Sequence, residues 1–251
     1  MRYLILSDVH GNWEALHAVL AHVRRKRFDR VIFLGDAVGY GGSPNQVMGW
    51  LRSLEPEPLA VRGNHDRVCG GLDSPEYFNR FAREAAIWTL GQLEPHHLEL
   101  LRALPVGPRE LTDRIAICHG SAIDEDAYIF SAFDATLSFG ALPQPVIFFG
   151  HTHVPSLFEL GAGGDSSALG VRLLSGRRVT VKLEPGHRYL INPGSVGQPR
   201  DRDPRASYAI FDDELSRLHL YRVDYRVSLA RQRILQAGLP AVLGDRLLYG
   251  V

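Results

Sequence analysis

Short apolar runs that end in polar residues recur along the first 153 positions. Five of them cover residues 3–6, 30–34, 59–62, 115–118 and 146–149. Near-continuous runs rich in Val, Ile, Leu and Phe are typical of strands buried on both faces of a sheet. Asp, His or Asn follows within two residues of each run, at the strand end where open α/β sheets place their ligands. We therefore predict an α/β core whose strand ends share a polar site.

Between and after these runs, apolar residues spaced three and four apart predict helices. The first covers residues 12–24, with Asn12 as its cap and Leu16, Val19 and Val23 on one stripe. Further helices are predicted over residues 44–54, 75–90, 94–104 and 227–237. In the helix over 75–90, the large side chains of Phe78, Phe81 and Trp88 are expected to face inward, at least in part.

The second half of the chain has a different pattern. Strand-like pieces recur at 156–160, 178–183, 188–191, 208–212 and 218–222, with turn residues between them. These pieces predict a second sheet packed on the first. The fold class expected is α/β: two packed mixed β-sheets flanked by helices, in a single domain over residues 1–251. Residues 121–133 are expected to begin as a loop after His119 and Gly120, and they could form part of the substrate rim. Residues 161–177 are expected to form a mobile excursion. Residues 239–251 suggest no function and could form a docked tail or an oligomer contact.

The amino-acid composition limits which binding partners are expected. The 251 residues are enough for one large domain with a buried core. Because 28 basic and 28 acidic residues balance, no basic field is available to attract nucleic acid, and we expect no such partner. No apolar run approaches the ~18 residues that span a bilayer, and residues 1–6 lack the pattern of a secretory signal, so the expected location is the cytoplasm. Two cysteines are too few for a disulfide framework; Cys118 is expected in the core and Cys69 as a free thiol.

The polar residues after the five runs suggest metal chemistry. Gly63, Asn64, His65 and Asp66 follow one another directly and, taken alone, would fit an ordinary turn. Together with the other four strand ends they offer only oxygen and nitrogen donors, a mixture suited to Mn, Fe or Zn rather than to a cysteine-based zinc site. Residues two apart in an extended segment face the same way, so Asp8 and His10 are expected to converge. His151 and His153 have the same spacing. The seven candidate ligands are Asp8, His10, Asp36, Asn64, His119, His151 and His153.

The motifs Asp8-x-His10, Gly35-Asp36, Gly63-Asn64-His65-Asp66, His119-Gly120 and Gly150-His151-x-His153 together resemble those of the calcineurin-like metallophosphoesterases. Within that superfamily the chain looks most like small bacterial phosphodiesterases and relatives of diadenosine tetraphosphatase. The run Asn-Pro-Gly-Ser-Val-Gly-Gln-Pro-Arg at 192–200 also looks like a segment of that family. The resemblance implies a four-layer sandwich with two divalent metal ions. One ion would have Asp8, His10, Asp36 and His153 as ligands, and the other Asp36, Asn64, His119 and His151.

Such a pair of cations clamps phosphoryl oxygens and lowers the pKa of a bridging water, which then attacks phosphorus as hydroxide. His65 is the predicted general acid for the leaving oxygen, and Asp66 is expected to hold its ring and favour its protonated form. Tyr40 and Arg200 are the candidate substrate contacts. The glycine-rich loop before and after Tyr40 could equally be a tight turn, and the alternation of Arg200 with acidic residues fits a solvated loop as well.

The function predicted is metal-dependent hydrolysis of small phosphodiesters or nucleotides. The alternatives within enzymes are a phosphomonoesterase or protein phosphatase and a dinucleoside polyphosphate hydrolase. A non-catalytic scaffold is the alternative from another class, but a scaffold is free to lose ligands, and this chain keeps every one of them. The remaining histidines match no motif and are expected to be surface or packed residues: His17, His22, His96, His97, His187 and His219.

Overall fold

A computed structural model describes residues 1–164 and 169–251, and within them two six-stranded sheets. The first sheet has the order β3 (Leu59–Ala60), β2 (Arg30–Phe33), β1 (Arg2–Leu6), β11 (Ala206–Asp212), β12 (Arg217–Val223) and β9 (Arg178–Lys182). The second has the order β4 (Arg109–Glu110), β5 (Ile115–Ile117), β6 (Val146–Phe148), β10 (Arg188–Asn192), β7 (Ser156–Leu160) and β8 (Gly170–Leu173). In each sheet parallel and antiparallel pairs are mixed.

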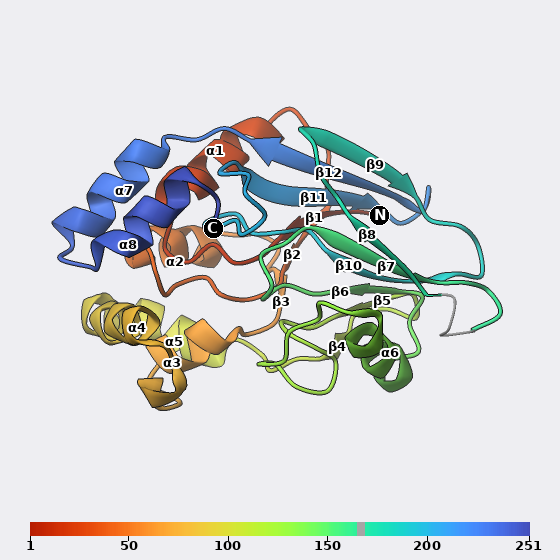
Figure 1. Ribbon diagram of the computed structural model, residues 1–251, viewed down its shortest axis with the longest axis horizontal. Helices are drawn as coiled ribbons and strands as arrows, with labels where there is room; N and C mark the ends of the chain where they lie inside the picture. The colour runs from red at the N-terminus through yellow and green to blue at the C-terminus, as the bar shows by residue number, and fades with distance from the viewer. Residues whose placement is uncertain (165–168) are drawn as a thin grey trace.

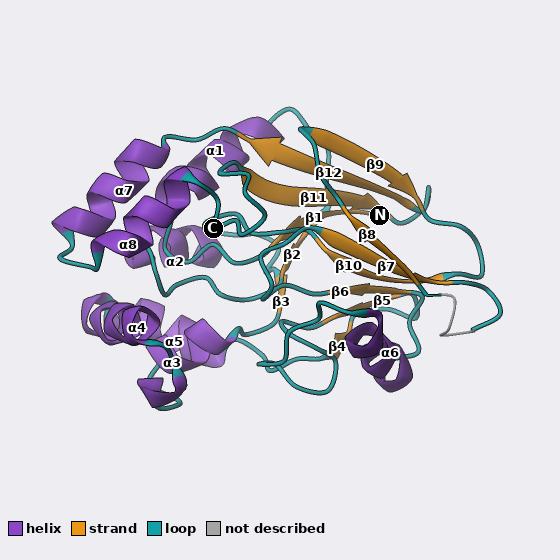
Figure 2. Cartoon of the chain, viewed as in Figure 1, coloured by secondary structure: helices purple, strands orange, loops and turns teal. Residues whose placement is uncertain are grey.

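The two sheets pack face to face because alternate residues of each strand point to opposite sides. Ile5 and Ile32 of the first sheet lie in one buried cluster with Phe148 of the second. The outer face of the first sheet is covered by α1 (Trp13–Val23) and α2 (Pro44–Arg52), and that of the second by α6 (Ala132–Ala141). Figure 2 shows the sheets between these helices. The predicted fold class, two packed mixed sheets in a four-layer α/β sandwich, is confirmed.

Most predicted helices are present. Asn12 caps α1 through a hydrogen bond from the backbone N–H of Ala15, as expected. The helix predicted over 75–90 is wrong at its start, since a 3₁₀ turn, η1 (Pro75–Tyr77), precedes α4 (Arg80–Gln92), which Asn79 caps. Phe81 therefore lies in the first turn of α4 and is 41% exposed rather than inward. The remaining helical segments are α3 (Asn64–Cys69), α5 (Pro95–Ala103), α7 (Val227–Gln236), α8 (Ala241–Asp245) and the 3₁₀ turn η3 (Arg246–Leu248).

The division of strands between the sheets differs from the prediction. The later strands were expected to form the second sheet alone, but β11, β12 and β9 extend the first sheet beside β1. The early strands β5 and β6 lie in the second sheet, where β6 pairs with β10. Each sheet therefore combines strands from both halves of the chain, as the mixed colours in Figure 1 show.

One loop prediction is confirmed and one needs correction. Residues 121–133 begin as a loop, as expected, and α6 starts at Ala132, after a capping box formed by Ser131 and Asp134. Part of the excursion expected over 161–177 is the strand β8, which pairs with β7, and residues 165–168 of that prediction lie outside the described residues. Cys118 is buried in the core as expected, and Cys69 is a free thiol that is also buried. Among the described residues, no helix is both long enough and apolar enough to cross a membrane.

Candidate metal centre

Six of the candidate ligands lie in loops that leave the carboxyl ends of β1, β2, β5 and β6, and the seventh, Asn64, begins α3 after β3. Five of these residues have a left-handed backbone: Asp8 (φ 54°), His10 (φ 49°), Asp36 (φ 56°), His151 (φ 63°) and His153 (φ 60°). For residues other than glycine this conformation costs roughly 1–2 kcal/mol each and is common at functional sites. The expectation that pairs such as Asp8 and His10 converge from extended backbone is therefore wrong. Tight left-handed turns bring them together.

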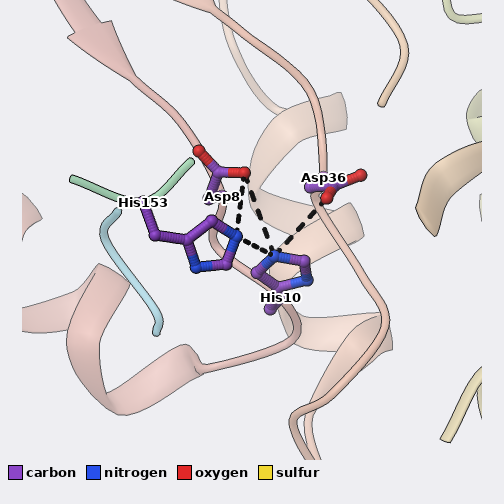
Figure 3. Close-up of side chains that lie close together, drawn as sticks. All are labelled: Asp8, His10, Asp36 and His153. Carbon is purple, nitrogen blue, oxygen red and sulfur yellow. Dashed lines mark hydrogen bonds and ion pairs between the residues drawn. The ribbon is translucent and has the colours of Figure 1, made fainter. Parts of the chain in front are cut away.

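The first cluster consists of Asp8, His10, Asp36 and His153, drawn in Figure 3. Each offers one ligand atom, and these four atoms all lie within 4.8 Å of one another. The Nε2 atoms of His10 and His153 are 3.1 Å apart. Asp36 Oδ2 lies 3.4 Å from His10 Nε2, and Asp8 Oδ1 lies 3.3 Å from His153 Nε2. All four side chains are buried.

The second cluster consists of Asp36, His119 and His151, whose ligand atoms also lie within 4.8 Å of one another. His119 Nε2 is 3.4 Å from Asp36 Oδ2 and 3.2 Å from the amide oxygen of Asn64. Asp36 thus belongs to both clusters. His151 and His153, although only two residues apart, lie in different clusters, which matches the division that the family resemblance implies.

The hydrogen bonds of the imidazoles fit a cation. The Nδ1 atoms of His10, His119 and His153 donate to the carbonyls of Val38 at 3.1 Å, Leu34 at 2.7 Å and Gln198 at 2.6 Å. A carbonyl only accepts, so each of these rings carries its proton on Nδ1 when neutral and presents an Nε2 lone pair to the cluster. Two lone pairs that face each other at 3.1 Å repel unless a positive charge separates them. Asp36 Oδ2 is buried and has no hydrogen-bond donor among the described residues.

Electrostatics supports the same conclusion. Burial lowers the pKa of His10 well below its usual value and that of His151 to about 3, so both rings are neutral, the form that binds a metal. Burial also opposes protonation of His119, but the Asp36 carboxylate raises the pKa of His119 to about 10. A cation would compete with that proton for the same ring nitrogen.

The segment over 192–200 positions the loops of the first cluster. Ser195 Oγ donates to the carbonyl of Asp8 at 2.7 Å, and Asn192 Nδ2 donates to the carbonyl of Gly150 at 2.6 Å. Gly197 allows the closest approach, because a Cβ there would lie 1.8 Å from the carbonyl oxygen of Val9. The family resemblance singled out this segment but gave it no role. Its glycines allow close backbone packing, and its Ser and Asn side chains bond to the neighbouring loops. These residue types are the sequence signal for a segment that supports the site.

Asp66 does not hold the ring of His65. Its carboxylate accepts hydrogen bonds from four backbone N–H groups, those of residues 36, 37, 38 and 63, at 2.8–3.3 Å. Asp66 thereby fixes the loop of Asp36 to the start of α3. His65 Nδ1 is buried without a hydrogen-bond partner among the described residues. Burial lowers the pKa of His65 to about 4, so the expectation that Asp66 favours its protonated form is not supported.

The structure places Tyr40 beside His65 and His10, with ring centroids 4.4 Å and 4.7 Å away. The guanidinium of Arg200 lies 5.9 Å from the centroid of Tyr40 and bonds to the side-chain oxygen of Gln198 at 2.9 Å. Tyr40, Asn64, His65 and His151 line a cavity of about 420 Å³ that opens from the clusters.

Two further residues that line this cavity, Asp126 and Tyr128, were not predicted from the sequence. The carbonyl of Asp126 accepts from His151 Nε2 at 3.0 Å, and the ring of Tyr128 stacks on His151 at 4.0 Å. Both residues belong to the loop that was expected at the rim, which is where the structure places them. Of the six histidines without a motif, none joins either cluster within the described ranges, and His96 and His97 form a separate group with Glu94.

Comparison with known proteins defines the class. The calcineurin-like phosphoesterase superfamily domain matches residues 1–214. The chain is 35% identical to an uncharacterised protein of Methanocaldococcus jannaschii over 98% of this chain and 97% of the relative. It is 23% identical to phosphodiesterase YfcE of Escherichia coli K12 over 86% of this chain and 89% of that one. A crystal structure of a metallophosphoesterase from Sphaerobacter thermophilus superposes with a TM-score of 0.87 and 41% identity, over 100% of both chains.

The chain therefore belongs to the calcineurin-like phosphoesterase superfamily. It is a metal-dependent phosphoesterase, a hydrolase, and its buried His and Asp clusters lie where the motifs of that family predict them. The expectation of an enzyme is confirmed, and the scaffold alternative is not carried further.

Proposed function

We propose that this chain is a dinuclear phosphodiesterase that hydrolyses small phosphodiesters or nucleotides. The observation that carries the proposal is the sharing of Asp36 by two buried clusters, in which His10 and His119 each point Nε2 at the same carboxylate oxygen from 3.4 Å. One cation would be held by Asp8, His10, Asp36 and His153, and the other by Asp36, Asn64, His119 and His151. When bound, two divalent ions such as Mn, Zn or Fe offset phosphoryl charge and lower the pKa of a bound water.

His65 is the proposed donor to the leaving oxygen. It lies on the wall of the cavity beside Phe78, with ring centroids 4.5 Å apart, in the same cavity as Asn64 and His151. With a pKa of about 4 its ring is neutral in the free protein and offers one N–H as a hydrogen-bond donor. The negative charge of a bound phosphodiester raises the pKa of a nearby imidazole, which makes proton transfer to the leaving oxygen easier.

Tyr40 and Arg200 are the proposed substrate contacts. Arg200 brings a positive charge close to His65, and guanidinium groups bind phosphate oxygens through paired hydrogen bonds. The similarity to phosphodiesterase YfcE favours a diester over a monoester. Phosphomonoester and dinucleoside polyphosphate hydrolysis are the competing reactions, since they differ from diester hydrolysis in contacts beyond the metal ligands.

The proposal is tested by the hydrolysis of bis-p-nitrophenyl phosphate beside p-nitrophenyl phosphate, after chelation and again after the return of Mn²⁺. Diester hydrolysis that disappears with the chelator, returns with Mn²⁺ and exceeds monoester hydrolysis is the expected result. A preference for the monoester would instead identify a phosphatase. If protein that holds two metal ions per chain hydrolyses neither compound, the result would contradict the proposal that it hydrolyses simple phosphate esters.

A further inference from the structure

The C-terminal segment forms a wall of a second cavity beside the metal centre. Its apolar residues Leu239, Leu243 and Leu247 pack in one cluster with Tyr40. A cavity of about 420 Å³ lies between α8 with η3 on one side and the start of α4 on the other, and Arg246 is one of its lining residues. Figure 1 shows α8, in blue, facing α4, in yellow, across this region.

The second cavity adjoins the first. Tyr40 and Asn79 line both of them, and the first also contains His65 and the candidate ligands Asn64 and His151. A molecule that places one phosphorus at the metal centre can therefore extend past Tyr40 toward Arg246.

Most charges that line the two cavities are neutralised within the protein. Arg67 pairs with Asp73 at 3.0 Å and with Asp126 at 2.7 Å. Arg80 pairs with Glu84 at 2.9 Å. Neither of these two guanidinium groups therefore offers an unpaired positive charge to a ligand.

Arg246, which lines the second cavity, and Arg200, which lies near the ring of Tyr40, are different. In the described part of the chain, neither of them forms an ion pair with an acidic side chain. Arg246 donates from Nε to the backbone oxygen of Val251 and makes no described hydrogen bond with its two terminal nitrogens. The side chain of Arg200 donates only to Gln198 Oε1 within the described residues. Burial lowers the pKa of Arg246, and the positive charge of Arg200 lowers it further.

Two like charges near one aromatic ring, neither paired with an acidic side chain among the described residues, favour the binding of an anion. We infer that Arg246, together with Arg200, binds a second phosphate group of the substrate, so that the preferred substrates are phosphodiesters that carry an additional phosphate. This inference rests on the proposed diester hydrolysis and names the substrate class for it. Guanidinium groups suit phosphate because their planar forks match its oxygens.

The test uses three dinucleotides that share one scissile diester. Dithymidine monophosphate is compared with the same molecule carrying an extra phosphate at its 5′ end or at its 3′ end, and products are separated by chromatography. For the Mn²⁺-loaded enzyme, kcat/KM for one phosphorylated form is expected to exceed that for the parent roughly tenfold. In Arg246→Ala that ratio is expected to fall to about one, and Arg246→Lys should keep part of it because the charge remains.

Arg80→Ala is the matched control, since Arg80 lines the same cavity but is neutralised by Glu84. It is expected to keep the full preference. Equal kcat/KM for all three dinucleotides in the wild-type enzyme, or a preference that survives in Arg246→Ala, would overturn the inference. An equal loss in Arg80→Ala would also overturn it, because the effect would then come from the general charge of the cavity.

A binding measurement separates this inference from the proposed reaction. If no dinucleotide is hydrolysed in the presence of Mn²⁺, the proposed function fails for this class of diester, but thermal shifts still test the anion site. Thymidine 3′,5′-bisphosphate is expected to raise the melting temperature of the Mn²⁺-loaded protein more than thymidine 5′-monophosphate does, and Arg246→Ala should abolish the difference. Equal shifts from both nucleotides in the wild-type protein would show that no second phosphate is bound.

Discussion

Each histidine of the metal centre is oriented by one backbone carbonyl. Those of residues 34, 38 and 198 accept from Nδ1 of His119, His10 and His153, and that of residue 126 accepts from Nε2 of His151. Because the second ring nitrogen is fixed, the first points at its cluster with little freedom to rotate. The sequence predicts the seven candidate ligands through their motifs. It does not predict their orienting partners, since any residue can supply a carbonyl.

Asp66 is a second residue whose side-chain contacts the sequence does not predict. A carboxylate next to a histidine in the sequence suggests a hydrogen-bonded pair, but Asp66 is the third residue of α3 and its side chain turns back to the helix start. There it meets the N–H groups of the Asp36 loop. The direction of a side chain depends on the local backbone, which residue types alone do not specify.

Asp66→Ala is expected to lower the free energy of unfolding by roughly 3 kcal/mol or more, because four buried N–H groups lose their acceptor. For a chain of this size that corresponds to a fall of roughly 6–12 °C in melting temperature. Calorimetry measures it, and Asp73→Ala, at a half-exposed carboxylate, is the control. A melting temperature within about 2 °C of the wild-type value would show that Asp66 has no such structural role.

His65→Ala is expected to slow hydrolysis in a way that depends on the leaving group. General acid catalysis contributes roughly 10²–10⁴-fold when the leaving oxygen needs a proton, and little when the leaving group is a stable anion. The loss of kcat should therefore be large for an alkyl phosphodiester and small for bis-p-nitrophenyl phosphate, with the metal content unchanged. The same loss for both substrates would argue against a role in protonation.

At the scale of elements, the segment after β10 locks together loops that are far apart in the sequence. Asn192 binds the loop after β6, and Ser195 and Gly197 bind the loop after β1. The first cluster therefore depends on a segment that contributes no ligand side chain to it.

Gly197→Ala is expected to weaken metal binding at the first cluster and to destabilise the fold, since its methyl group would overlap the carbonyl of Val9. Metal titration and thermal unfolding together detect both effects. Gly91→Ala is the matched control, because no atom lies within 4 Å of the new methyl group in α4. That substitution should stabilise the protein by about 0.5–1 kcal/mol. If Gly197→Ala behaved like Gly91→Ala, the segment would not support the site.

The elements that were predicted well have a strong local pattern. The apolar stripe and the Asn12 cap of α1 identify that helix without tertiary information. In contrast, β8 has four exposed residues and is a strand because it pairs with β7 at the sheet edge. The break between η1 and α4 depends on the cap at Asn79, which competes with a continuous helix.

At the scale of the whole molecule, the metal centre joins the two sheets. Asp8 and Asp36 follow β1 and β2 of the first sheet, whereas His119, His151 and His153 follow β5 and β6 of the second. The number and approximate length of the strands can be predicted from apolar runs. Their division between sheets cannot, because β6 and β11 are both buried and apolar, and only packing decides their neighbours.

Since the ligands come from both sheets, metal ions should stabilise the folded state against unfolding. At a free Mn²⁺ concentration of 100 times the dissociation constant, one site adds about 2.7 kcal/mol. The melting temperature should therefore rise with Mn²⁺ and fall on chelation, with a smaller response in Asp36→Asn because both clusters lose a shared carboxylate. A melting temperature that is independent of Mn²⁺ would contradict a centre that bridges the sheets.

The most direct measurement is the number of metal ions per chain, determined by mass spectrometry of the elements after loading with Mn²⁺ and removal of unbound metal. The proposed centre predicts about two ions in the wild-type protein, about one in His153→Ala and fewer than one in Asp36→Asn, with hydrolysis of bis-p-nitrophenyl phosphate falling in parallel. One ion or none in the wild-type protein, or two ions that remain in Asp36→Asn, would contradict a dinuclear site that shares Asp36.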